Sequence, residues 1–300
     1  MRDILLRSET TMTNSRALDS LRLQVMQTLS AAGITDSDVD AELLIGHVLG
    51  LGRGEVQARL ILKDLVTDEH ERLILELTAR RAAREPLQHI LGVAWFRSLT
   101  LEVGPGVFVP RPETEQLAQM GIDALRSLAE RSPIAVDLGT GSGAIALALA
   151  SEVPHARIFA VEKSSDAMPW TRKNFERLGA DNAILIQGDL ADAFSELDGT
   201  VAVVVSNPPY IPTDAIPRDP EVQLHDPHLA LYGGDDGLDV VRLVSQAGLR
   251  LARSGGALMM EHGELQGEDI RNILITDGWR ATATHRDLLG RDRYTSATRP

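Results

Sequence analysis

The strongest constraint on the fold is the apolar run at residues 201–205, which leads into the sequence Asn207-Pro208-Pro209-Tyr210. The run is short, rich in β-branched side chains and apolar at every position, which predicts a strand buried on both faces of a parallel sheet. In open α/β folds, ligands bind beyond the carboxyl ends of such strands. The four residues after the run are therefore candidates for a functional site, although an Asn-Pro turn by itself gives the same pattern.

The two prolines make this candidate loop stiff. Each proline fixes its own φ angle and biases the residue before it away from helical conformation. The loop can then hold the Asn207 carboxamide oxygen, the Pro208 carbonyl and the Tyr210 ring around one small planar group.

Strand and helix patterns alternate through the second half of the chain. Strands are expected at 134–138, 157–162, 183–187, 201–206 and 257–261, helices from 143, up to 178 and at 238–252, and a closing strand pair at 282–285 and 294–297. This alternation predicts an α/β fold with a parallel, doubly wound sheet.

The first part of the chain is helical in pattern. Leu18, Leu21, Val25 and Leu29 recur at helical spacing, and further helices are expected from Thr35 as an N-cap, over 55–62, and from Thr67. Residues 1–12 are polar and are expected to lack regular structure. A β-hairpin is expected to pair 99–103 with 107–109 around Gly104-Pro105-Gly106. The expected domains are 15–92, a hairpin linker at 93–112, and 113–300.

Composition narrows the class of protein. The chain has 43% hydrophobic and 24% charged residues, no cysteine and a formal net charge of −13, which is typical of a globular protein without disulfides or thiolate metal sites. The negative charge argues against broad binding to nucleic acid, although Arg80, Arg81 and Arg84 form a candidate basic patch. No apolar stretch approaches the roughly 20 residues of a membrane span, so a cytoplasmic protein without a membrane partner is expected.

A glycine-rich loop, Asp137-Leu138-Gly139-Thr140-Gly141-Ser142-Gly143, joins the first expected strand to its helix. Glycines allow the backbone to pass close to a ligand, and Glu162 stands at the end of the second strand, where such folds bind a ribose diol. The spacing departs from the dinucleotide fingerprint. A nucleoside with an amino-acid tail fits better, because Asp137 can meet an ammonium group, whereas a tight turn without a ligand is the alternative.

The motifs together resemble a known class. The glycine loop, Glu162, the pair Gly188-Asp189 and Asn207-Pro208-Pro209-Tyr210 are similar to S-adenosylmethionine-dependent methyltransferases that modify planar exocyclic or amide nitrogens. The segments 84–92, 108–115 and 290–293 (REPLQHILG, FVPRPETE and GRDR) resemble the peptide chain release factor glutamine methyltransferases.

The resemblance implies a class I methyltransferase fold, a Rossmann-like seven-stranded sheet with helices on both faces, preceded by a small all-α domain and a β-hairpin linker. It implies methyl transfer to the N5 nitrogen of a glutamine in class 1 peptide chain release factors, with S-adenosylmethionine as cofactor, S-adenosylhomocysteine as product, no metal, and a monomeric enzyme. The implied cofactor-binding residues are Asp137, Leu138, Gly139, Thr140, Gly141, Glu162, Asp189, Leu190 and Asn207. The implied substrate-binding residues are Pro110, Arg111, Asn207, Pro208, Pro209 and Tyr210, of which Asn207, Pro208 and Tyr210 are catalytic.

Several alternatives stay open at this point. An adenine-N6 methyltransferase acting on DNA or RNA would use the same loop chemistry, and a non-enzymatic protein could keep the same fold. His225, Asp226 and His228 are better explained as a surface turn than as a metal site. Residues 211–236 are expected to form a flap over the substrate, with ordinary loop filler as the alternative. The helical domain is expected to dock the release factor, with a purely structural role as the competing interpretation.

Overall fold

The structure, a computed structural model, describes residues 15–300 of the chain. By its internal contacts the chain divides into two compact units, Met1–Leu91 and Gly92–Pro300. The expectation for residues 1–12 lies outside the described residues.

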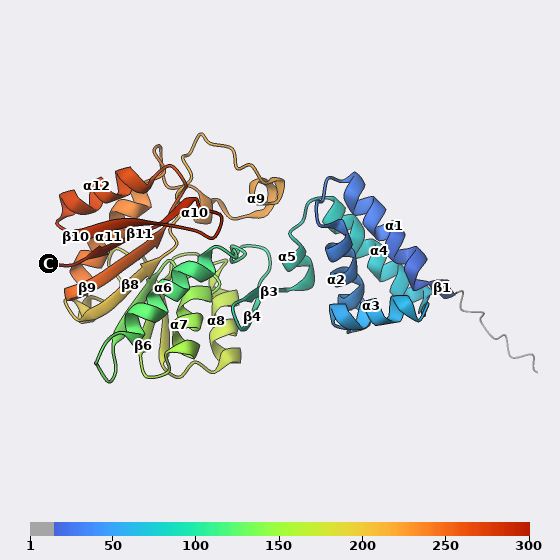
Figure 1. The fold of residues 1–300 in the computed structure, drawn as a ribbon, viewed down its shortest axis with the longest axis horizontal. Coiled ribbons are helices and arrows are strands. Elements are labelled where there is room, and N and C mark those ends of the chain that lie inside the picture. The colour runs from blue at the N-terminus through green and yellow to red at the C-terminus, as the bar shows by residue number, and fades with distance from the viewer. Residues whose placement is uncertain (1–14) are drawn as a thin grey trace, which may run out of the picture. The chain divides into compact units, whose positions relative to one another are not determined.

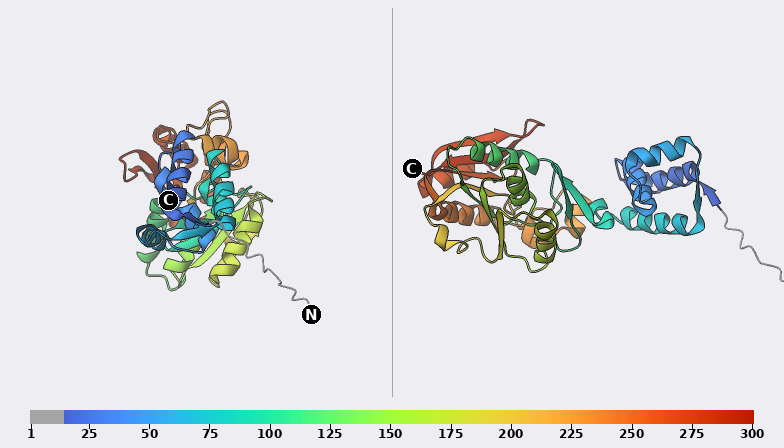
Figure 2. Two further views of the ribbon diagram at one scale, coloured as in Figure 1. Left: turned by 90° about the vertical axis from the view of Figure 1, so that its right-hand side faces the viewer. Right: turned by 90° about the horizontal axis from the view of Figure 1, so that it is seen from below.

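The first unit is a bundle of short helices (Figure 2). Its elements are β1 (Ser15–Ala17), α1 (Leu18–Ala31), α2 (Ser37–Leu49), α3 (Arg53–Ile61), β2 (Leu65–Thr67), α4 (Asp68–Ala82) and α5 (Leu87–Leu91). Helix α1 buries Leu18, Leu21, Val25 and Leu29, the four side chains whose spacing predicted it. The antiparallel pairing of β1 with β2 was not expected, because three-residue strands carry almost no periodic signal.

The two expected helix caps in this unit have different outcomes. Thr67 caps α4, since its hydroxyl accepts a hydrogen bond from the amide of His70 at 3.3 Å. The expectation for Thr35 is wrong, because α2 begins at Ser37 and Asp36 occupies the N-cap position.

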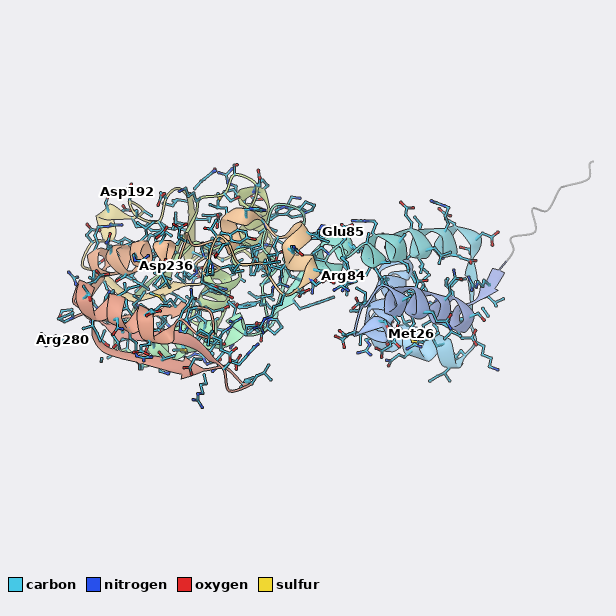
Figure 3. All side chains as sticks on the ribbon, turned by 90° about the horizontal axis from the view of Figure 1, so that it is seen from above. Met26, Arg84, Glu85, Asp192, Asp236 and Arg280 are labelled. Atoms are coloured by element: carbon cyan, nitrogen blue, oxygen red, sulfur yellow. The ribbon has the colours of Figure 1, made fainter. Side chains whose placement is uncertain are left out.

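The candidate basic patch is neutralised by acidic partners. Arg80 Nη2 lies 2.5 Å from Glu85 Oε1, and Arg81 Nε lies 2.7 Å from Asp40 Oδ2. Arg84, which is labelled with Glu85 in Figure 3, donates to a backbone carbonyl. Two of the three arginines, Arg80 and Arg81, are therefore neutralised and do not form the positive surface that phosphate backbones attract.

The second unit is built on a seven-stranded sheet in the order β10-β11-β9-β8-β5-β6-β7 (Figure 1). Its strands are β5 (Ile134–Leu138), β6 (Arg157–Glu162), β7 (Ala183–Gln187), β8 (Val201–Ser206), β9 (Ala252–Glu261), β10 (Arg280–Arg286) and β11 (Asp292–Thr298). Strands β5 to β9 pair in parallel, while β11 runs antiparallel to both β9 and β10. The predicted doubly wound α/β sheet is confirmed, with one reversed strand near its edge.

Helices cover both faces of this sheet (Figure 1). Its helices are α6 (Thr114–Arg126), α7 (Ala144–Glu152), α8 (Met168–Leu178), η1 (Ser195–Leu197), α9 (Pro220–His225), α10 (His228–Leu231), α11 (Asp239–Leu251) and α12 (Gly267–Asp277). Helices α6, α7 and α8 pack on the core that contains Val203 and Val205, and α11 and α12 pack on the core that contains Val204. Every residue of β8 is buried, as expected for a strand between two helical layers.

The hairpin that opens the second unit differs from the expected one. It pairs β3 (Val93–Phe96) with β4 (Leu99–Glu102) around a turn at Arg97, whose φ is 53°. Residues 107–109 form no strand, although Val107 and Val109 are fully buried beside the hairpin. Gly104 is needed for packing, because a Cβ there would lie 2.3 Å from the Trp170 ring. Apolar alternation continues past β4 because these side chains are buried, which is why the sequence pattern extended the hairpin.

Candidate active site

A cavity of about 1280 Å³ lies at the carboxyl ends of the parallel strands, within the second unit. The predicted site residues that line it are Pro110, Arg111, Leu138, Gly139, Thr140, Gly141, Glu162, Asp189, Leu190, Asn207, Pro208, Pro209 and Tyr210. Asp137 is the predicted site residue outside this lining, because it is fully buried in β5 beneath the cavity. Residues from four strand ends therefore meet where an open α/β sheet binds its ligand.

The glycine loop, residues 139–143, is open toward the cavity. Gly139 and Gly141 have φ angles of 77° and 57°, and a Cβ at either position would meet no atom within 4 Å. The loop is held against β6, because the Val161 carbonyl accepts hydrogen bonds from the Gly139 and Thr140 amides. A ligand can therefore lie directly against this backbone.

Glu162 organises the same region with its carboxylate. Oε2 accepts from the Gly141 amide at 2.8 Å, and Oε1 accepts from the Ser164 amide at 2.7 Å. A carboxylate has about four lone-pair sites, so both oxygens keep capacity for ligand hydroxyls.

Asp137 leaves one oxygen without a partner. Its Oδ2 accepts from the Thr140 hydroxyl at 2.6 Å and from the Ala146 amide at 3.1 Å, while the buried Oδ1 has no hydrogen-bond partner. Burial raises the pKa of this carboxyl to about 7. A buried acceptor without a donor fits a ligand that brings a cationic N–H group.

Asp189 and Leu190 form a mixed polar and apolar part of the cavity wall. Asp189 accepts from the Ala191 amide at 3.0 Å and pairs with Lys163 Nζ at 2.9 Å, and these two contacts lower its pKa. Leu190 lies on the same wall, next to Gly188. This combination suits a planar heterocycle with a polar edge.

The acceptor loop, as we name residues 207–210, follows β8 directly. The Tyr210 carbonyl accepts from Gln266 Nε2 at 2.9 Å, and the Arg293 Cζ lies 5.6 Å from the centre of the Tyr210 ring. Burial raises the pKa of Tyr210 to about 12, so its phenol stays neutral at physiological pH. Asn207 donates from Nδ2 to Thr114 Oγ1 at 3.2 Å.

The segment 211–236 is closed at its base by backbone pairing. Ile211 bridges to Tyr232, and the Thr213 amide donates to the Gly234 carbonyl at 2.9 Å. Gly233 is required there, because a Cβ would lie 2.6 Å from the Pro209 carbonyl oxygen. Asp236, labelled in Figure 3, ends the segment beside Arg242, whose hydrogen bond lowers the Asp236 pKa to about 2.

The prediction that Asp226 belongs to a surface turn is wrong. Its side chain is buried and lies 2.6 Å from Arg111 Nη2, which joins the segment 211–236 to the predicted substrate-binding arginine. Burial raises the Asp226 pKa to about 6, although Arg111 counteracts this. Within residues 15–300, no group of three or more His, Asp or Glu side chains is placed to hold a metal ion.

Sequence reasoning gave no role to three residues that hold the acceptor loop: Thr114, Glu261 and Gln266. Glu261 is 1% exposed, and its Oε2 accepts from the Thr114 hydroxyl at 2.8 Å. Burial raises its pKa to about 7. The sequence did contain one sign of this role, because a carboxylate at the end of an apolar strand is buried and therefore needs polar partners.

The sheet order, with its single reversed strand near the edge and a ligand cavity at the strand ends, is that of a class I methyltransferase, the class that uses S-adenosylmethionine. A Thermus thermophilus 16S rRNA N2 G1207 methyltransferase, solved in complex with AdoMet and guanosine, superposes with a TM-score of 0.52 at 20% identity. The match covers 69% of this chain and 50% of that chain, and it supports the fold alone.

Sequence comparison identifies the family. Residues 20–92 match the PrmC N-terminal domain and residues 99–218 the methyltransferase small domain. The release factor glutamine methyltransferase of Streptomyces coelicolor is 48% identical, over 91% of this chain and 95% of its own. That of Mycolicibacterium smegmatis is 46% identical, over 91% and 94%. This chain belongs to the release factor glutamine methyltransferase family.

One relative is named for a different activity. The 4-amino-L-phenylalanine/4-methylamino-L-phenylalanine methyltransferase of Streptomyces pristinaespiralis is 39% identical, over 85% of this chain and 84% of its own. Relatives of similar identity thus act on a protein in one case and on a small aromatic amine in the other.

Proposed function

We propose that this enzyme transfers the methyl group of S-adenosylmethionine to the side-chain N5 nitrogen of the glutamine in the GGQ loop of class 1 peptide chain release factors. The observation that carries the proposal is the orientation of the Asn207 side chain. Its amide nitrogen donates a hydrogen bond to Thr114 Oγ1 at 3.2 Å at the cavity wall, which leaves its carbonyl oxygen able to accept from the N–H of a substrate amide. Family membership supplies the acceptor class.

The cofactor, when bound, supplies an electrophilic methyl group on a sulfonium. Glu162 would bind the ribose hydroxyls, and the unpartnered Asp137 Oδ1 would accept from the ammonium group. Asp189 and Leu190 would hold the adenine, and the open glycine loop would carry the amino-acid tail.

The acceptor glutamine presents a weak nucleophile, because an amide nitrogen lone pair is delocalised into its carbonyl. Asn207 Oδ1 and the Pro208 carbonyl would accept its two N–H groups, fix it in line with the methyl and stabilise the positive charge that develops. The Tyr210 ring would stack on the planar amide. No base is needed before transfer, since the methylated product is acidic enough to lose its proton to water.

A release factor also needs a surface on which to dock, because specific interfaces bury about 800 Å² on each partner. The helical unit together with residues 84–92 is the proposed docking region, and the enzyme is proposed to act as a monomer in the cytoplasm without contacting nucleic acid or membranes. Among the helices of residues 15–300, none is long and apolar enough to cross a bilayer.

Removal of residues 1–83 tests the docking role. Cofactor affinity should be retained, since the lining of the cavity lies entirely within residues 106–293. The apparent KM should rise much more for intact release factor than for a short glutamine peptide. Equal rises for both substrates would assign the helical unit a structural role instead.

Methyl incorporation from labelled S-adenosylmethionine tests the function itself. Release factor, duplex DNA, RNA and 4-amino-L-phenylalanine serve as parallel acceptors. Incorporation into release factor, lost when its GGQ glutamine is replaced by alanine, is the expected result. Preferential labelling of the nucleic acids or of the aromatic amine would overturn the proposed acceptor.

A further inference from the structure

Asn207 is held by a chain of polar side chains from distant elements. Thr114, the first residue of α6, donates from Oγ1 to Glu261 Oε2 at 2.8 Å and accepts from Asn207 Nδ2 at 3.2 Å. The Asn207 side chain also faces the Glu261 carboxylate: burial raises the pKa of that carboxyl, and Asn207 helps to lower it against this larger effect. Thr114 is 4% exposed and Glu261 1%, so the bond between them is shielded from water.

The sheet register explains why these residues meet. Ser206, the last residue of β8, pairs with Met260 of β9, so Asn207 and Glu261 are the next residues on neighbouring parallel strands. Helix α6 begins at Thr114 and packs across β8 and β9. The hydroxyl is thereby placed against both side chains.

Hydrogen-bond chemistry fixes the direction of this chain. Above its pKa of about 7, the Glu261 carboxylate is ionised and only accepts, so the Thr114 hydroxyl donates its single proton to it. The Thr114 oxygen can then only accept, and the Asn207 group that faces it must be the NH2 end of the amide. The Asn207 carbonyl oxygen is therefore excluded from this contact and is directed elsewhere.

This direction matters because an asparagine amide is nearly symmetric in shape. With the amide rotated by half a turn, Asn207 would present its NH2 group to the NH2 group of the acceptor, and two donors would face each other. A small difference in hydrogen bonding therefore decides whether the loop accepts or repels an amide nitrogen.

We propose that Thr114 and Glu261 are positioning residues that lock the amide of Asn207 with its oxygen toward the acceptor nitrogen. The inference rests on the proposed function, because it assigns Thr114 and Glu261 an effect on turnover that they exert through Asn207. Glu261 lies outside the cavity lining, and Thr114 acts through its hydrogen bond to Asn207. Their effect should appear in kcat and leave cofactor affinity unchanged.

The matched variants Thr114→Val and Thr114→Ser test this lock. Valine keeps the shape and removes the hydroxyl, so kcat should fall about 10-fold, the scale of one lost hydrogen bond, while serine restores it to within about three-fold. Cofactor affinity, measured by calorimetry, should stay within about three-fold in both. Ser245→Ala, at a fully buried serine that donates to the Asp277 carboxylate and accepts from Trp279 Nε1, is the control for the loss of a buried hydroxyl outside the cavity.

A double-mutant cycle separates positioning from general structural damage. Combined with Asn207→Ala, Thr114→Val should reduce kcat no further, because its target is already absent. An unchanged kcat in Thr114→Val, or additive losses in the double variant, would overturn the inference. If Asn207→Ala itself keeps normal turnover, the proposed function of the acceptor loop fails instead.

Glu261→Gln carries the same test if Thr114→Val does not fold. A glutamine amide both donates and accepts, so the hydroxyl no longer has a fixed direction. A kcat lowered several-fold at unchanged cofactor affinity is expected. Normal kcat in this variant would overturn the inference.

Discussion

The glycine loop and the acceptor loop follow neighbouring strands of one sheet, yet they are held in opposite ways. The glycine loop bonds to residues that follow it by at most 32 positions in these contacts, namely Val161, Glu162, Thr171 and Asn174. The acceptor loop is held by Thr114, Gln266 and Arg293, which arrive from α6, from the start of α12 and from β11. One loop is held by residues from the next part of the chain, whereas the other depends on side chains that only the complete fold brings together.

This difference suits the two tasks. A cofactor with a fixed shape can be bound by an open backbone and a few carboxylates. An amide nitrogen must be aligned with a methyl group, and small misplacements there are costly to rate. Damage to the glycine loop should therefore appear in cofactor affinity, and damage to the acceptor loop in turnover.

Asn207→Ala should give the largest effect, a loss of turnover, and tests most directly whether the acceptor loop serves the methyl-transfer step. Removing one acceptor aimed at transition-state charge should lower kcat by about 100-fold or more. Cofactor affinity should change much less. Single-turnover kinetics at saturating substrate provides the measurement, and near-normal turnover would refute the role of Asn207.

Glu162→Ala should give the next largest effect, a loss of cofactor affinity at the glycine loop. Losing its charge-assisted hydrogen bonds should weaken cofactor binding by roughly 2–3 kcal/mol, after partial compensation by water. Calorimetry measures this, with the exposed Glu176→Ala in α8 as control. Unchanged affinity in a folded variant would remove Glu162 from the cofactor site.

The pH dependence of cofactor affinity tests the proposed contact between Asp137 and the ammonium group of the cofactor. Burial raises its pKa to about 7, and only the ionised carboxylate can pair with an ammonium group. Affinity should therefore be highest above pH 7 and fall by up to about 10-fold per unit below it, since protons then compete with the ligand. Asp137→Asn should flatten the profile.

The profile is best measured from about pH 5.5 to 7.5, where an α-amino group with an ordinary pKa of about 7.7–8.0 stays largely charged. A wild-type affinity that does not change over this range would contradict the proposed contact between Asp137 and the ammonium group.

Tyr210→Phe should give the smallest effect. The ring is the part proposed to stack on the acceptor, and the raised pKa keeps the phenol neutral, so turnover should stay within about three-fold of wild type. Tyr210→Ala removes the ring and should cost considerably more. A large loss in Tyr210→Phe would show that the hydroxyl takes part.

The same contrast explains what the sequence could predict. The parallel strands, the glycine loop and the exit of β8 are local patterns. Strands β5 to β8 were expected at their observed bounds, whereas β9 begins at Ala252, five residues before its expected start. The bond from Thr114 to Glu261 joins residues 147 positions apart, and that from Arg111 to Asp226 spans 115. Single-sequence periodicity carries no information on such pairs.

Other misses have local causes. The hairpin was extended to Val109 because Val107 and Val109 are buried at alternate positions although they lie outside a strand. Thr35 and Asp36 are both good N-cap residues, so the sequence alone did not choose between them. The burial of Asp226 was missed because its partner, Arg111, lies in a different part of the chain.

The backbone pairs that close the segment 211–236 bear on how the enzyme's preference for a methyl acceptor could change. Ile211, Thr213, Tyr232 and Gly234 pair through their backbones, so these anchors do not depend on the side chains between them. Apart from Asp226, which is buried against Arg111, those side chains can therefore change with little effect on the backbone of the acceptor loop. Grafting the corresponding residues of the 4-amino-L-phenylalanine methyltransferase between these anchors, with Asp226 kept, would test whether the segment sets the methyl acceptor.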